Sequence, residues 1–284
     1  MPLPLGVVDA FTRERFRGNP AAVCLPPPDT SARWMQSVAA ELNLSETAFA
    51  TRLEPGRWAL RWFTPRVEVD LCGHATLATA HWLWESGCEP ASQSLRFETR
   101  SGPLECRCDG ERLGEGRIAM DFPAQPAREI PAPDGLGAAL GIEAVRVGRS
   151  RDDLLVELAT AEEVRSLRPD VDALSRFPVR GVIVTARSDR ADADFVSRFF
   201  APAVGINEDP VTGSAHCTLA CHWSDRLGRT DLTGFQASAR GGTVGVELRG
   251  ERVRLLGHAV TAWRGEWMGD PESTGTSAAP LNRP

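Results

Sequence analysis

The sequence predicts an α+β protein of two similar halves, each a curled β-sheet around a central helix. Three observations lead to this prediction. Strand-like segments outnumber helix-like segments, a short series of motifs in the first half recurs in the second, and the recurring helices are unusually apolar. At 284 residues the chain is long enough for two domains of ordinary size.

Strands are predicted where apolar residues alternate with polar ones, or where β-branched residues follow one another. These runs lie at Leu5–Ala10, Ala21–Cys24, Ala48–Leu53, Arg57–Phe63, Ser94–Thr99, Leu104–Cys108, Arg117–Asp121, Val145–Val147, Asp153–Leu158, Gly181–Ala186, Thr243–Leu248, Arg252–Leu256 and Val260–Glu266.

Helices are predicted from the helical spacing of apolar residues and from capping signals. They lie at Ser31–Leu42, His74–Ser86, Ala161–Ser166, Asp170–Arg176 and Ser214–Leu227. The Pro-rich segments Pro26–Pro28 and Pro123–Pro133 are expected to be surface connections, and the second is a candidate domain boundary. The tail 270–284 is rich in Gly, Pro, Ser and Thr, so we expect it to pack loosely.

The internal repeat is the most useful signal of organisation. The stretch Arg61–Pro65 reappears as Arg198–Pro202, at 198 − 61 = 137 positions on. Gly73–Ala75 then matches Gly213–Ala215, at 213 − 73 = 140, and a third match follows inside the helix. In each half a strand and a proline-containing loop lead to a glycine that opens a helix. We therefore predict that the chain arose by duplication.

The helix after Gly73 is small or apolar on nearly every side, so it belongs inside a shell of strands. Its first N–H groups still need partners. If Gly73 and Gly213 open toward one interdomain cleft, the two positive helix ends would hold a carboxylate or an enolate-like charge. The alternative is that each glycine only permits a tight turn into a buried helix.

Glu46 is the candidate proton carrier. The spacing of Asn43 and Glu46 resembles a capping box, but the predicted helix ends before Asn43, and the residues after Glu46 are typical of a strand. Glu46 would then lie at a corner between helix and strand, flanked by apolar Leu44 and Phe49. Burial there would raise its pKa and suit it to both give and take a proton near neutrality.

Two further titratable residues lie next to the predicted helix ends. His74 is in the first turn after Gly73, where an imidazole can donate to a carboxylate or relay a proton, although a lone histidine is more often structural. Asp209 precedes the second helix start. It could simply complement that helix end, or face another acid across the cleft and split their pKa values.

The cysteines offer weaker candidates. Cys72 precedes Gly73, so its thiol could be activated at the helix end, but the second half has Thr212 at that place. The run His216–His222 contains two cysteines and two histidines and superficially suggests zinc. Packing in a buried helix is the favoured interpretation, and we expect no metal.

The composition excludes several kinds of chemistry. The chain contains no lysine, which removes Schiff-base catalysis and the phosphate-binding lysines of P-loop proteins and kinases, and no tyrosine. A net charge of −6 argues against nucleic acid or an anionic membrane as the main partner. Without a long apolar run or signal-peptide features at the N-terminus, we expect a cytoplasmic protein that does not enter the membrane.

Together these stretches resemble the PhzF family, the phenazine-biosynthesis-type isomerases of the diaminopimelate epimerase superfamily. Each motif alone is weakly specific, but the ordered set is strong and covers nearly the whole chain. The matching segments are Val8–Phe11, Gly18–Val23, Asn43–Phe49, Phe63–Pro65, Glu68–Thr76, Met120–Pro123 and Glu208–Ala215.

The resemblance implies two barrel-like, largely antiparallel domains, each around a central helix, with the site between them, usually in a homodimer and without cofactor or metal. It implies that Glu46 is the catalytic acid/base, that His74 and Asp209 assist it, and that Gly73, Gly213 and Ser214 contact the substrate, beside Cys72. We place the domains at 1–117, completed by a strand near 260–268, and at 118–259.

We therefore predict a cofactor-independent isomerase that moves a proton between carbons of a small carboxylated metabolite, without assuming the phenazine substrate. A racemase or epimerase that uses Cys72 with Glu46 or Asp209 is the alternative enzyme, although Asp209 stands where the second thiol would serve. A non-catalytic binding protein that retains the fold is the alternative outside catalysis.

Overall fold

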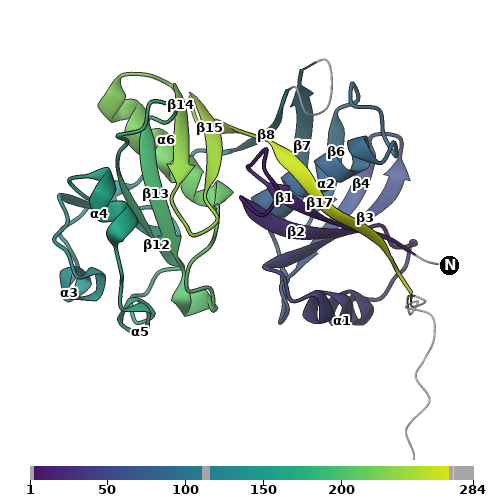
Figure 1. Ribbon diagram of the computed structural model, residues 1–284, viewed down its shortest axis with the longest axis horizontal. Coiled ribbons are helices and arrows are strands. Elements are labelled where there is room, and N and C mark those ends of the chain that lie inside the picture. The colour runs from purple at the N-terminus through teal and green to yellow at the C-terminus, as the bar shows by residue number, and fades with distance from the viewer. Residues whose placement is uncertain (1–2, 111–115, 269–270, 272–284) are drawn as a thin grey trace, which may run out of the picture.

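The computed structural model describes residues 3–110, 116–268 and 271, and its two halves lie side by side (Figure 1). The tail predicted at 270–284 lies outside the described residues, apart from Pro271. Seventeen strands form one continuous, strongly curled sheet in the described residues. Among these residues, no helix is long and apolar enough to cross a membrane.

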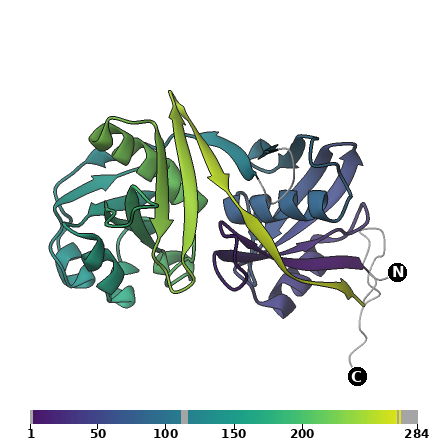
Figure 2. The ribbon, with the colours of Figure 1, turned by 45° about the horizontal axis from the view of Figure 1, so that its top comes forward.

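The first half is an eight-stranded curl in the spatial order β17, β1, β2, β3, β4, β6, β7, β8. Its C-terminal strand, β17, returns from the far end of the chain to pair with β1, as Figure 2 shows. The strands are β1 (Leu3–Ala10), β2 (Asn19–Cys24), β3 (Glu46–Glu54), β4 (Arg57–Phe63), β6 (Leu95–Thr99), β7 (Gly102–Asp109), β8 (Arg117–Pro123) and β17 (Ala259–Trp267), with the short β5 (Glu68–Val69) against β4.

The second half repeats this order as β9 to β16. The parallel pairs recur at the same places, β2–β3 and β4–β6 in one half and β11–β12 and β13–β14 in the other. All other strand pairs in the described residues are antiparallel. The strands are β9 (Arg128–Glu129), β10 (Arg146–Arg149), β11 (Asp153–Glu157), β12 (Gly181–Arg187), β13 (Phe195–Phe200), β14 (Asp231–Gln236), β15 (Gly242–Arg249) and β16 (Arg252–Gly257).

One long helix lies inside each curl. Nearly every residue of α2 (Gly73–Glu85) is buried, which explains why it has no polar stripe. The strands approach it closely: a Cβ on Gly6 would lie 2.0 Å from the ring of Trp82, so only glycine fits there. In the second half α6 (Gly213–Leu227) takes the same place, and the predicted helix-centred curls are confirmed (Figure 1).

The remaining helices cover the outside of the sheet. They are α1 (Ala32–Leu42) on the first half, and α3 (Leu136–Leu140), α4 (Ala161–Ser166) and α5 (Val171–Leu174) on the second, with a 3₁₀ turn at Pro202–Val204. Ser31 caps α1, and Asn43 ends it in the left-handed conformation, with φ of 49°. Because α1 ends there and β3 begins at Glu46, these two residues form no capping box.

The predicted strands and helices are all present, with ends shifted by a few residues. The sequence analysis missed β5, β9, β13, β14 and α3. In β13 every residue is buried, including Ser197 and Arg198, so the strand shows no alternation of apolar and polar residues. The domain boundaries stay a prediction, because β8 pairs with β7 of the first half and with β16 of the second.

Candidate active site

The two enclosed helices begin face to face. A Cβ placed on Gly73 would lie 3.9 Å from the Cα of Gly213, and the reverse distance is also 3.9 Å. The residues before them, Cys72 and Thr212, adopt extended conformations, and neither caps its helix with its side chain. The sequence-predicted meeting of two helix N-termini is therefore present, and it concentrates partial positive charge in one small volume.

A cavity of ≈120 Å³ opens at these helix ends. Its lining includes every residue that the sequence analysis assigned to the site: Glu46, Cys72, Gly73, His74, Asp209, Gly213 and Ser214. The same cavity also has an apolar side, formed by Phe199 and its neighbours, and one arginine, Arg180.

Glu46 is the first residue of β3 and is only 9% exposed. Burial, together with the negative charge of Asp209, raises the pKa of its carboxyl from the ordinary 4.5 to about 8. A carboxyl with a pKa in this range is populated in both protonation states near neutral pH. Glu46 can therefore give and take a proton, which is the property that general acid–base catalysis requires.

His74 contacts Glu46 directly, with 3.2 Å between His74 Nε2 and Glu46 Oε2. Its other nitrogen, Nδ1, lies 3.2 Å from Asn19 Nδ2 and 3.5 Å from Cys72 Sγ. Burial lowers the pKa of His74 to about 3, so the imidazole is neutral. The neutral ring carries one hydrogen, and its Nε2 faces the carboxyl of Glu46.

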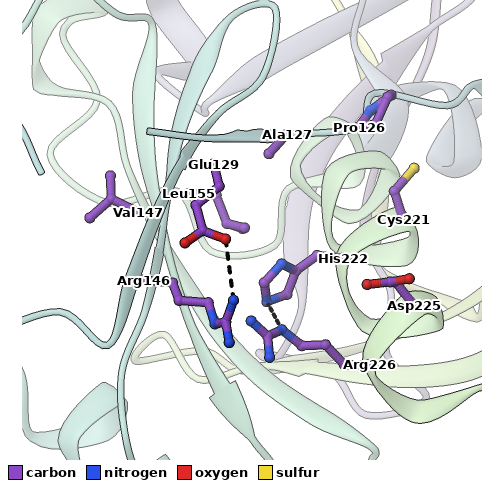
Figure 3. A pocket seen from close by; sticks show the side chains of 11 residues that line it. Pro126, Ala127, Glu129, Arg146, Val147, Leu155, Cys221, His222, Asp225 and Arg226 are labelled. Atoms are coloured by element: carbon purple, nitrogen blue, oxygen red, sulfur yellow. Dashed lines mark hydrogen bonds and ion pairs between the residues drawn. The ribbon is translucent and has the colours of Figure 1, made fainter. Parts of the chain in front are cut away.

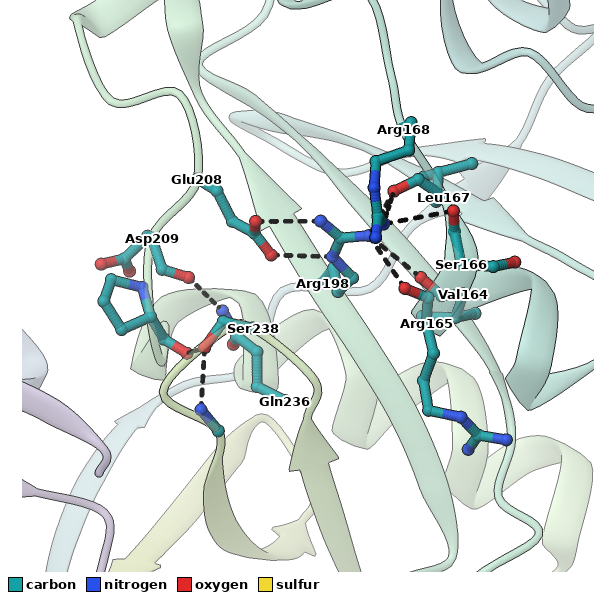
Figure 4. Close-up of polar contacts among 12 residues, drawn as sticks. Val164, Arg165, Ser166, Leu167, Arg168, Arg198, Glu208, Asp209, Gln236 and Ser238 are labelled. Carbon is teal, nitrogen blue, oxygen red and sulfur yellow. Dashed lines mark hydrogen bonds and ion pairs between the residues drawn. The ribbon is translucent and has the colours of Figure 1, made fainter. Parts of the chain in front are cut away.

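Asp209 lies in the loop that leads from β13 to α6. Its carboxylate accepts hydrogen bonds from Asn19 Nδ2, at 2.9 Å, and from Thr212 Oγ1. Its backbone carbonyl accepts from Gln236 Nε2 at 2.7 Å (Figure 4). Burial raises the pKa of Asp209 to about 6, and these side-chain hydrogen bonds work against the rise. Asp209 is thus held by a side-chain network and does not cap the helix.

Asn19 is a site residue that sequence reasoning missed. It is fully buried at the start of β2 in the first half, yet its amide donates to Asp209 Oδ1 and to the carbonyl of Val211, both in the second half. It therefore ties Asp209 and the loop before α6 to the first half, next to His74. The available signal was a polar residue at the start of an otherwise apolar strand, NPAAVC.

An Arg–Glu pair braces the loop before each central helix. Arg61 donates two hydrogen bonds to Glu68, at 2.7 and 2.8 Å, in the first half. Arg198 donates two to Glu208, at 2.7 and 2.9 Å, in the second, and also bonds carbonyls near α4 (Figure 4). Arg61 and Arg198 are also matched in the sequence repeat, so the two halves share this doubly hydrogen-bonded Arg–Glu pair.

Cys72 lies within the same cluster as a buried thiol. Burial and the charges of Glu46 and Asp209 raise the pKa of Cys72 well above its ordinary value, which disfavours a thiolate. Donor atoms of Glu46, Cys72 and His74 lie within 4.8 Å of one another, a set of types that zinc accepts. The absence of a metal stays a prediction, which metal analysis of the purified protein would test.

The second cysteine- and histidine-containing run serves packing and ion pairing. On α6, Cys217 lies over the carbonyl of Gly213, and His222 contacts Glu157 at 3.2 Å. A cavity of ≈300 Å³ beside His222 also contains Arg146 and Arg226 (Figure 3). Both of its arginines already have ion-pair partners, Arg226 with Glu157 and Arg146 with Glu129, so its larger volume does not make it the better candidate.

Comparison with known proteins bears on the family and on the fold. The family model described as phenazine biosynthesis-like protein, PhzC-PhzF, matches residues 8–265. A protein of Pseudomonas aeruginosa named as an uncharacterized isomerase is 52% identical over 260 residues, which cover 92% of this chain and 96% of the relative. The crystal structure of a PhzF-family phenazine biosynthesis protein from Enterococcus faecalis is 42% identical, with a TM-score of 0.87, and the match covers 94% of this chain and 99% of that one.

A more distant comparison bears on the fold alone. The structure of a hydroxyproline epimerase from Agrobacterium vitis superimposes with a TM-score of 0.62 at 14% identity, and the match covers 98% of this chain and 96% of that one. The two-curl architecture is thus shared with an epimerase.

Proposed function

Because the chain belongs to the PhzC-PhzF phenazine biosynthesis-like family, we propose that it is an isomerase that moves a proton between carbons of a small carboxylated substrate without a cofactor. One observation carries the proposal. Glu46, whose pKa is raised to about 8, faces a small cavity at which two helix N-termini meet. A proton carrier and an anion-binding element therefore lie side by side.

In this proposal each residue has a separate role. The first-turn N–H groups after Gly73 and Gly213, with the hydroxyl of Ser214, hold the substrate carboxylate and the negative charge that develops on it. Glu46 takes a proton from one carbon and returns it to another. The imidazole of His74 packs against the carboxyl of Glu46, with Nε2 3.2 Å from Oε2, and the charge of Asp209 raises the pKa of Glu46.

The asymmetry of the two halves favours a single proton carrier. The parallel pair β2–β3 of the first half corresponds to β11–β12 of the second. Glu46 opposes Ala21 in the first pair and Gly181 opposes Asp153 in the second, so Gly181 occupies the position equivalent to Glu46. A Cβ at Gly181 would lie 2.4 Å from the ring of Phe199, which leaves no room for an acid there. One residue that both removes and returns the proton suits an isomerisation within one face of the substrate.

Glu46→Gln tests the proposal. We expect a screen of small carboxylic acids in deuterated water to identify a compound whose C–H groups exchange with solvent when the wild type is present. The variant should lose this exchange by a factor of at least about 10² to 10⁴, the usual contribution of a general acid–base group, while binding of the same compound is largely retained. Exchange at the wild-type rate would refute the role of Glu46.

A racemase or epimerase based on Cys72 is the second candidate, favoured by the 3.5 Å contact of Cys72 Sγ with His74 Nδ1. It predicts deuterium uptake at a stereocentre and inactivation by thiol alkylation. The raised pKa of Cys72 and the presence of Thr212 at the matching position argue against it.

The cytoplasmic location and the homodimer also stay predictions. Light scattering on the eluate of a sizing column would test the dimer.

A further inference from the structure

Arg180 is the one arginine in the lining of the cavity, and a buried acid fixes its position. Arg180 precedes β12, and its Nε donates to Asp153 Oδ1 at 2.9 Å while Nη2 donates to Asp153 Oδ2. Asp153 is completely buried. The guanidinium also lies over the ring of Phe199, with 5.4 Å from Cζ to the ring centre. Its orientation is therefore set before any ligand arrives.

This anchoring leaves part of the guanidinium available. Asp153 accepts the single hydrogen of Nε and one hydrogen of Nη2. Both hydrogens of Nη1 and the second hydrogen of Nη2 therefore remain available to a ligand. Among the described residues no protein group accepts from Nη1, and about a third of the Arg180 side chain is exposed. The edge formed by Nη1 and Nη2 has the two parallel N–H groups that fit a carboxylate.

Arg180 and Glu46 line the same cavity, Arg180 from the second half of the chain and Glu46 from the first. Gly73 and Gly213 line this cavity too, and the strand register gives Gly181, the neighbour of Arg180, the place in the second half that Glu46 has in the first. A substrate whose first carboxylate lies on the helix ends would present its reacting carbon to Glu46 on one side. Its other end would then extend toward Arg180.

We propose that Arg180 binds a second carboxylate and that the substrate is a small dicarboxylate. This inference rests on the proposed function for the position of the first carboxylate. The cavity is small, at ≈120 Å³, which favours a short carbon chain between the two carboxylates. A purely structural role for Arg180, neutralising Asp153, would give dicarboxylates no advantage.

Isothermal titration at pH 7 with malonate and succinate, each compared with the monocarboxylate of equal length, propionate and butyrate, tests the proposal. The wild type should bind at least one dicarboxylate about tenfold more tightly than its monocarboxylate, as expected for an added charge-assisted hydrogen bond. The double variant Arg180→Met/Asp153→Asn removes the guanidinium without leaving a buried charge. It should bind each dicarboxylate about as tightly as the monocarboxylate of equal length.

Three further variants complete the experiment. Arg180→Lys keeps Asp153 paired but lacks the planar fork, so it should lose several-fold of the preference even if the double variant does not fold. Arg146→Met, beside the separate cavity of Figure 3, is the matched control and should keep the preference. Glu46→Gln should keep it too, which separates this inference from a failure of the proposed catalytic role.

An unchanged preference in Arg180→Lys or in the double variant would overturn the proposal. So would an equal weakening of mono- and dicarboxylates, which would mean that Arg180 shares a single carboxylate with the helix ends. The absence of any preference in the wild type would overturn it as well.

Discussion

Replacing Glu46 by glutamine should change the stability of the protein in a way that depends on pH. Glutamine has nearly the same shape but never ionises. In the wild type, burial raises the pKa of Glu46 to about 8 in the folded state, whereas the unfolded chain has the ordinary value of 4.5. Between these two values the folded state retains a proton that the unfolded state releases, so the free energy of unfolding falls as pH rises.

The size of the effect follows from the same two values. Each unit of pKa difference corresponds to about 1.4 kcal/mol. The variant should equal the wild type at pH 4, apart from a constant offset from packing. It should gain about 3 kcal/mol relative to the wild type at pH 7, which is 2.5 units above 4.5, and about 5 kcal/mol at pH 9, where the effect is complete.

Urea unfolding of both proteins at pH 4, 5.5, 7 and 9 measures this difference directly. Titrating groups that do not interact with Glu46 behave alike in both proteins, and their contributions cancel in the difference. Cys72→Ser, an uncharged change in the same cluster, is the matched control and should show no comparable slope. A difference between Glu46→Gln and the wild type that stays constant from pH 4 to 9 would show that Glu46 ionises normally in the folded protein.

Three further predictions concern catalysis. In the direction in which Glu46 removes the proton, kcat/KM should rise with pH to a plateau above about 8, because the carboxylate is the active form. Asp209→Asn should shift this rise to lower pH, because it removes a charge that raises the pKa of Glu46. A flat profile from pH 6 to 9 would contradict this. Gly73→Ala should fold, since its Cβ meets only Gly213 Cα and Phe122 Cζ, each at 3.9 Å. It should nevertheless raise KM about tenfold or more, because the methyl group fills the space between the helix ends. Titration calorimetry would measure the loss of binding, and thermal unfolding would measure any loss of stability. Cys72→Ser should retain most of the activity if Glu46 alone carries the proton, whereas a dead variant would favour the epimerase.

Sequence reasoning succeeded where local pattern and local chemistry coincide. The all-apolar composition of α2 predicts enclosure, and the repeat of Arg61–Pro65 and Gly73–Ala75 predicts two equivalent helix starts. Glu46 could be selected because an acid between Leu44 and Phe49, at the start of a strand, is in surroundings that raise its pKa.

It failed where a residue's environment comes from distant segments. Arg198 interrupts the apolar pattern of β13, and its burial makes sense only once Glu208 and the carbonyls near α4 are beside it. Asn19 is separated from Asp209 by 209 − 19 = 190 positions, and nothing in its own neighbourhood indicates that its amide joins the two halves.

By itself, the sequence determined the two-curl architecture, the enclosed helices and the residues that gather at their starts, because hydrophobic periodicity and glycine-opened helices are local properties repeated along the chain. Only the tertiary structure decided how these residues act together. The pKa of Glu46, the neutral state of His74, and the presence of Arg180 in the same cavity as Glu46 all depend on burial or on groups brought close from the other half of the chain. Electrostatic energies inside a protein depend on distance and solvent exposure, and both are set by the packed fold rather than by sequence order.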